Sequence, residues 1–138
     1  MSDVVVKTPG TRETLTTHDD TVFAGACVRA TAAGETDYLP AEAYHPIKQV
    51  LDATNKRFGE TYATGDEVEC DTPPIGAHRM VRVHATSTQG ALEFGDVLGH
   101  STNGRLVKVS DTDDARGVAI ARQAVAVNTT ATILVEVI

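Results

Sequence analysis

The sequence predicts a mainly β fold: a small β-barrel or β-sandwich-like domain with one short helix and an extended N-terminal arm. Three observations lead to this prediction. Apolar and polar residues alternate over several short stretches, which is the period of a half-buried strand. Gly, Pro and Asn mark turns between these stretches. Hydrophobic residues make up 41% of the chain and aromatic residues only 4%, so the expected core consists mainly of Val, Ala, Leu and Ile.

The 138 residues are expected to form an arm and one domain. Residues 1–21 are polar and rich in Thr, and we expect them to extend from the body of the protein. The arm contains a short apolar run that favours an extended strand, formed by Val4, Val5 and Val6. Residues 22–138 are long enough for a single β-rich domain.

One segment, residues 45–58, is predicted to form the short helix. A proline near its start suits the first turn of a helix. Ile47, Val50 and Leu51 then recur at the spacing of one helix face, and a glycine directly after the segment is a natural stop.

Seven to nine short strands are expected in the rest of the chain. In residues 78–86, Val81, Val83 and Ala85 fall on one face, and Met80, Arg82 and His84 fall on the other. Asn103-Gly104 is a strong signal for a hairpin turn, because both turn positions must tolerate a positive φ. Further strands are expected at residues 22–31, 65–71, 117–121 and 131–138.

A weak internal repeat accompanies this pattern. Residues 25–34 and 95–104 both begin and end with Gly at the same spacing and enclose an apolar pair, and residues 65–68 repeat the beginning. An old duplication of a strand–turn–strand unit explains the similarity. Chance similarity in a β protein rich in Gly and Thr explains it equally well.

The net charge of −7 argues against binding to nucleic acid, because phosphate contacts require a basic surface. No apolar run approaches the roughly 20 residues of a membrane span, and the N-terminus lacks the apolar centre of a secretory signal. We therefore expect no membrane partner and a protein that is made in the cytoplasm. Nineteen acidic residues, twelve basic residues and few lysines are typical of proteins from salt-loving archaea. An ordinary acidic protein encoded by a high-GC genome is the alternative.

No residue pattern predicts catalysis, a cofactor or a metal ion, so we expect no enzyme. The acidic segment 111–116 lacks two ligand positions of a calcium loop. His78 and His84 are too far apart on one strand to share a zinc ion. Cys27 and Cys70 fit neither a disulfide scaffold nor a metal site, and we expect each to be a small buried hydrophobe. A disulfide between the two is the alternative.

Residues 95–121 and the C-terminal strand nevertheless carry a recognisable pattern. It consists of Gly-Asp with an apolar pair, a turn with Gly, a polar loop, Gly-Val-Ala and a closing apolar strand; the residues are Gly95, Asp96, Val97, Leu98, Gly104, Leu106, Gly117, Val118, Ala119 and residues 133–137. This pattern resembles the capsid decoration (head-stabilising or cement) proteins of tailed viruses. The family usually has another Gly before its last strand, so Asn128 would make that turn here.

The resemblance implies a structural virion protein on the outer surface of an icosahedral capsid. Such a protein binds the major capsid protein as a homotrimer and stabilises contacts between capsid subunits. The composition then points to a virus of haloarchaea. We expect the arm, with Val4, Val5 and Val6, to pair with a neighbouring sheet edge. Two alternatives remain: another virion component, such as a turret, tail-tube or adaptor protein, and a small trimeric β-barrel enzyme.

Overall fold

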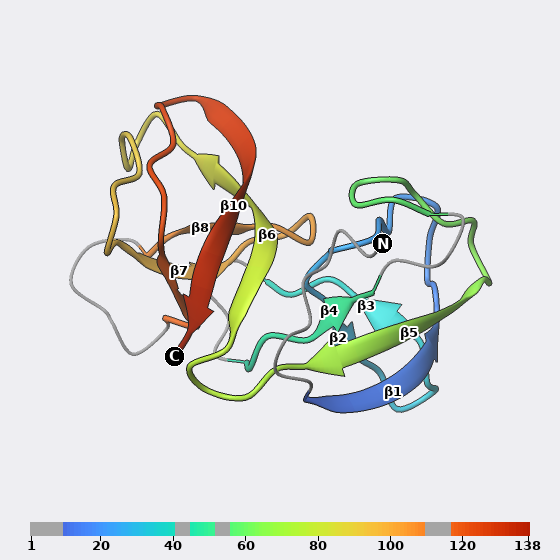
Figure 1. Ribbon diagram of the computed structural model, residues 1–138. Coiled ribbons are helices and arrows are strands. Elements are labelled where there is room, and N and C mark those ends of the chain that lie inside the picture. The colour runs from blue at the N-terminus through green and yellow to red at the C-terminus, as the bar shows by residue number, and fades with distance from the viewer. Residues whose placement is uncertain (1–9, 41–44, 52–55, 110–116) are drawn as a thin grey trace.

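The computed structural model describes residues 10–40, 45–51, 56–109 and 117–138. These residues form two lobes that lie side by side, a first lobe within residues 10–72 and a second lobe within residues 73–138 (Figure 1). The strands of the first lobe are β1 (Thr11–Thr16), β2 (Arg29–Ala30), β3 (Thr36–Asp37), β4 (Gln49–Val50) and β5 (Glu67–Thr72). Those of the second lobe are β6 (His78–Ala85), β7 (Val97–His100), β8 (Leu106–Lys108), β9 (Ala119–Ala121) and β10 (Thr129–Val137).

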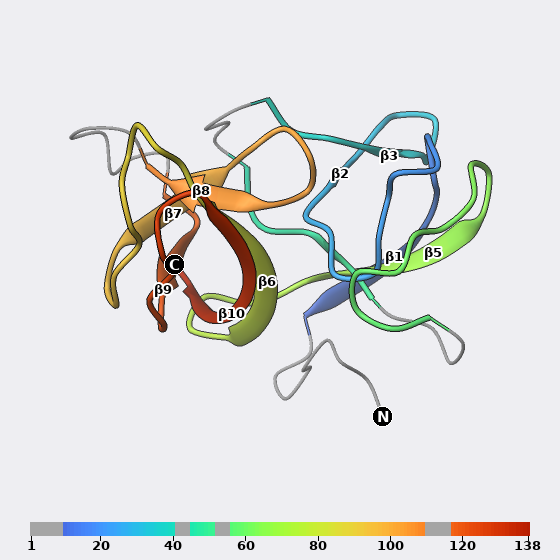
Figure 2. The same cartoon turned by 90° about the horizontal axis from the view of Figure 1, so that it is seen from above.

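The second lobe is a closed barrel with the strand order β10-β6-β8-β7-β9. Figure 2 shows its strands curling into a ring. The two long strands β6 and β10 pair antiparallel, and β8 runs parallel to β6. Val81 and Val83 alternate with exposed or half-buried neighbours and pack in the barrel against Ile133 and Val135. The predicted small β-barrel and the predicted alternation along this strand are both confirmed.

The first lobe is a looser version of the same arrangement. It contains a three-stranded sheet, β1-β5-β4, and the separate pair β2-β3. Two isolated bridges connect these pieces into a ring, a parallel bridge between Thr16 and Glu35 and an antiparallel bridge between Cys27 and Gln49. Its core is a cluster of small and medium apolar side chains with few aromatics: Leu15, Val22, Phe23, Ala24, Ala26, Val28, Val50, Tyr62, Val68 and Cys70.

The two lobes repeat one another strand by strand. The β2-β3 hairpin pairs Ala30 with Thr36, and the β7-β8 hairpin pairs His100 with Leu106, each residue being 70 positions later. In each lobe the next strand, β4 or β9, pairs antiparallel with the last one, β5 or β10. The first strand of each lobe also pairs antiparallel with the last. Between duplication and chance, this shared topology supports duplication.

Turns with a positive φ recur at corresponding places in the two lobes. Gly25 and Gly95 make the first turn, with φ of 98° and 93°. Gly65 and Asn128 make another such turn, before the last strand of each lobe. The N–H of Gly65 donates to the carbonyl of Thr17, directly after β1, at 3.0 Å, and the N–H of Asn128 donates to the carbonyl of Ala85, at the end of β6, at 2.6 Å. Asn128, with φ of 58°, is the only non-glycine residue with positive φ in the described chain, and it forms the turn that the resemblance assigned to it.

The prediction of one short helix is wrong, because the described residues contain no helix. Residues 45–51 are extended and include β4. Ile47 lies in the core of the second lobe and Val50 in the core of the first. Residues three apart on an extended backbone point to opposite sides, so the spacing that resembled one helix face instead supplies two cores. The described residues also form ten strands, more than the seven to nine expected.

Buried polar contacts join the two lobes. Arg79 of β6 donates to Asp71 of β5 at 2.7 Å, and neither side chain is exposed. Gln49 donates its side-chain amide to the carbonyls of Gly25 and Met80, one in each lobe. The guanidinium of Arg82 lies 4.2 Å from the ring centre of Phe23. These contacts stabilise one relative placement of the lobes, because each buried group would lose its partner if they separated.

Candidate attachment surface

The residues predicted to bind a capsid, Val4, Val5 and Val6, lie outside the described residues. The predicted arm therefore stays a prediction. The part of residues 1–21 that the structure describes includes β1, which pairs with β5 along its length. Leu15 of this strand lies in the core of the first lobe.

The described residues offer no cluster for chemistry. No group of three or more His, Cys, Asp or Glu side chains among them could hold a metal ion, and the acidic segment 111–116 lies outside them. Cys27 and Cys70 are both buried and unbonded, in different cores. Burial raises the pKa of each thiol to about 12, which leaves neither as a thiolate near neutral pH. The described part of the chain also has no helix long and apolar enough to cross a membrane.

His100 is a buried histidine with a structural role. Its Nε2 donates to the carbonyl of His45 at 2.8 Å, and its Nδ1 has no partner among the described residues. Burial lowers the pKa of His100 below its ordinary value of 6.5, because a second proton would place an unpaired charge in the interior. The folded protein therefore binds this proton less readily than the unfolded chain does.

We expect stability to depend on pH through His100. A depressed folded pKa contributes stability that is present above pH 6.5 and is lost as the pH falls through that value. The free energy of unfolding should fall between pH 7 and pH 5, and His100→Gln should reduce this slope. Urea unfolding at several pH values measures both. An unchanged slope in the variant would show that other groups cause the dependence.

Charge divides sharply between the lobes. Residues 1–72 contain thirteen acidic and six basic residues, and residues 73–138 contain six of each, so the first half carries the whole net charge of −7. Burying unpaired charge at an interface costs free energy. Contact with another protein is therefore less unfavourable through the second lobe than through the first.

The exposed large hydrophobic residues divide in the opposite way. Among the described residues there are four, Ile75, Phe94, Val127 and Ile138, and all belong to the second lobe. Ile75 and Ile138 lie at the same end of the barrel, because the neighbouring residue Gly76 donates to the carbonyl of Val137 at 2.7 Å. The exposed large apolar side chains of the described residues are thus concentrated on the second lobe, as is typical of the part of a molecule that carries an interaction surface.

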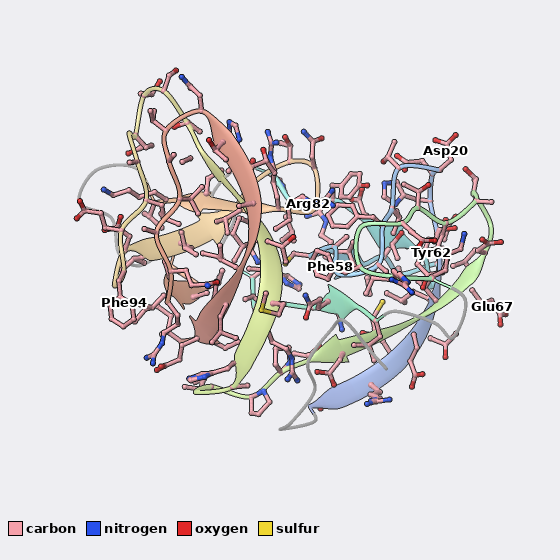
Figure 3. All side chains as sticks on the ribbon, turned by 45° about the horizontal axis from the view of Figure 1, so that its top comes forward. Asp20, Phe58, Tyr62, Glu67, Arg82 and Phe94 are labelled. Atoms are coloured by element: carbon pink, nitrogen blue, oxygen red, sulfur yellow. The ribbon has the colours of Figure 1, made fainter. Side chains whose placement is uncertain are left out.

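Phe94 lies on the barrel surface away from the first lobe (Figure 3). The guanidinium of Arg122 lies 5.1 Å from its ring centre, and Arg122 also donates to Glu136 at 3.2 Å. Glu136 lies 3.4 Å from His78 on β6. The result is an exposed aromatic ring with a cation held over it, a combination that is enriched at protein interfaces.

Sequence reasoning singled out neither Phe94 nor Arg122. Phe94 directly precedes the Gly95-Asp96 pair that carries the family resemblance, and it is one of only three phenylalanines in the chain. An aromatic residue beside a turn glycine in a chain with so few aromatics was the available signal. The exposure of Phe94 depends on the tertiary structure, since Ala24, the residue at the corresponding position of the first lobe, is fully buried.

The fold is similar to that of a solved viral protein, the N base of head fiber gp8.5 from bacteriophage phi29. The TM-score is 0.53 at 11% sequence identity, and the match covers 93% of this chain and 97% of that chain. At this identity the likeness shows a shared fold. Neither the known protein-family models nor the sequences of curated proteins give a match to this chain.

Proposed function

We propose that this protein is a structural virion component of a tailed virus. It binds the outer surface of an icosahedral capsid and stabilises contacts between major capsid subunits. The observation that carries the proposal is the shared fold with the base of a phage head fiber over nearly the whole of both chains. The decoration-protein pattern of residues 95–121 leads independently to the same class of protein.

The two lobes suit this role in different ways. The second lobe, without net charge and with all four exposed large hydrophobics of the described chain, is the side that we assign to the capsid. The first lobe carries the negative charge and faces solvent, where an acidic surface keeps particles apart. The role needs a stable shape and an adhesive surface, and it needs no catalysis.

Two further features belong to the proposal. A homotrimer on the capsid would bury apolar surface that a small domain with few aromatics leaves exposed. The acidic composition with few lysines favours a virus of haloarchaea as the source. Val4, Val5 and Val6 are proposed as a capsid contact that pairs with a sheet edge.

A second candidate role is that of an anchor for a fiber. The matched structure is the base of a head fiber, so a fiber attached to this domain would fit the same capsid position. A decoration protein and a fiber anchor differ in what projects from the domain, and both require capsid binding.

The proposal predicts that the purified protein binds capsids of its virus that lack it, in a fixed number of copies. Sedimentation with capsids gives the copy number, and a reconstruction of the decorated particle gives the position. Trimers at three-fold or quasi-three-fold positions are the expected result, and removal of residues 2–9 should weaken binding without unfolding the domain. Density at the tail or at five-fold vertices alone would contradict the proposed position on the shell.

A further inference from the structure

The surface around Phe94 has a counterpart in the first lobe, and there it is covered. The first turns of the lobes correspond, with Ala24-Gly25 in place of Phe94-Gly95. Corresponding backbone hydrogen bonds fix the alignment. The N–H of Tyr62 donates to the carbonyl of Val22 at 2.8 Å, and the N–H of Val125 donates to the carbonyl of Leu92 at 2.9 Å. The same backbone site can therefore be compared in its closed and open forms.

In the first lobe, the segment before Tyr62 closes this site. The N–H of Ala24 donates to the carbonyl of Glu60 at 3.0 Å, and the N–H of Gly59 donates to the carbonyl of Ala24 at 2.9 Å. The ring of Phe58 lies directly against Gly25, where a Cβ atom would come within 2.1 Å of it. The cover thus consists of two main-chain hydrogen bonds and one aromatic side chain.

In the second lobe, the covering segment is missing because the chain is shorter. Eleven residues separate the end of β4 from Tyr62, but only three separate the end of β9 from Val125. No described residue makes a hydrogen bond with the N–H or the carbonyl of Phe94 itself, and nothing lies within 4 Å of a Cβ placed on Gly95. The Phe94 side chain is 65% exposed.

We infer that the Phe94-Gly95 turn is a docking site for an extended segment of another protein. The first lobe indicates the chemistry of the occupant: a large apolar side chain over the turn glycine and a backbone that pairs antiparallel with Phe94. The second lobe has no net charge and Arg122 beside the site is paired with Glu136, so the occupant is defined by its apolar side chain and its backbone. Main-chain pairing supplies affinity in such docking, and the side chain supplies specificity.

The occupant that we assign is a segment of the major capsid subunit, and this assignment rests on the proposed function. The site belongs to the lobe without net charge, which the proposal turns toward the capsid. It lies on the side of the barrel away from the first lobe, so the acidic surface of the same chain does not obstruct it (Figure 3).

A peptide with the sequence of residues 56–62 is a probe that needs no knowledge of the capsid. Millimolar peptide should shift the amide signals of Phe94, Gly95 and Arg122 and slow hydrogen exchange at the Phe94 amide. A peptide with Phe58→Ser should lose these effects. Equal shifts with both peptides, or shifts confined to other surfaces, would overturn the site.

Capsid binding tests the occupant. Phe94→Ser should lower affinity for capsids by roughly tenfold or more, as expected for a central aromatic contact. Glu67→Ser, which removes an exposed side chain from β5 of the first lobe, should change it less than about twofold. Unchanged capsid binding by Phe94→Ser, or a loss of self-association instead, would overturn the capsid as the occupant. If the wild-type protein binds no capsids, the proposed function fails, and the peptide experiment still decides whether the site exists.

Discussion

Replacement of Arg79 with leucine should lower the free energy of unfolding by about 3–5 kcal/mol, the usual cost of leaving one member of a buried ion pair alone. Asp71 would keep a carboxylate in a place with no exposure, where the Gly10 N–H at 3.0 Å is its other side-chain partner among the described residues. Urea unfolding followed by circular dichroism measures the loss.

Two further variants test this explanation. Replacing both Asp71 and Arg79 with leucine removes the unpaired charge, so the double variant should be more stable than Arg79→Leu alone. Arg12→Leu breaks the exposed pair with Glu69, at 3.5 Å, and should cost less than about 1 kcal/mol. A similar loss for Arg12→Leu and Arg79→Leu would show that burial of the pair is unimportant.

Gly25→Ala should destabilise the protein much more than Gly95→Ala, although the two glycines have nearly the same backbone conformation. Each substitution places a side chain at a positive φ, which costs about 1–2 kcal/mol. At Gly25 the added methyl group also collides with the ring of Phe58, and overpacking adds about 1–3 kcal/mol. At Gly95 the space is open.

The pair of variants is its own control, since the backbone strain is common to both. Urea unfolding of the two proteins gives the difference directly. An equal loss of stability would mean that Phe58 moves away at little cost. The covered turn of the first lobe would then be a poor guide to the occupant of the open turn in the second.

The duplication explains how one small chain can carry two kinds of surface. Both lobes use the same strand order and the same turns, so neither needs a different fold for its role. The first lobe has an acidic surface and a segment that covers its first turn. The second kept that turn open, with Phe94 exposed beside it. Protein contact and solvation can thus be optimised separately in the two copies.

The sequence alone determined the features that depend on neighbouring residues. Alternation predicted β6 with Val81 and Val83 inside, and Asn128 was expected to make a turn. Asn103-Gly104 predicted the β7-β8 hairpin, in which Gly104 has a positive φ and Asn103 does not. These patterns are local: side-chain direction in a strand follows from its period of two, and turn conformation follows from which residues tolerate a positive φ.

Only the tertiary structure decided where these local pieces meet. The spacing of Ile47 and Val50 fits one face of a helix and also two faces of a strand, and the presence of a core on each side selected the strand. Asp71 and Arg79 form a buried pair, and Phe94 is exposed where Ala24 is covered. Burial of this kind depends on contacts between residues far apart in the chain, and local sequence periodicity contains no information about which distant segment will cover a given side chain.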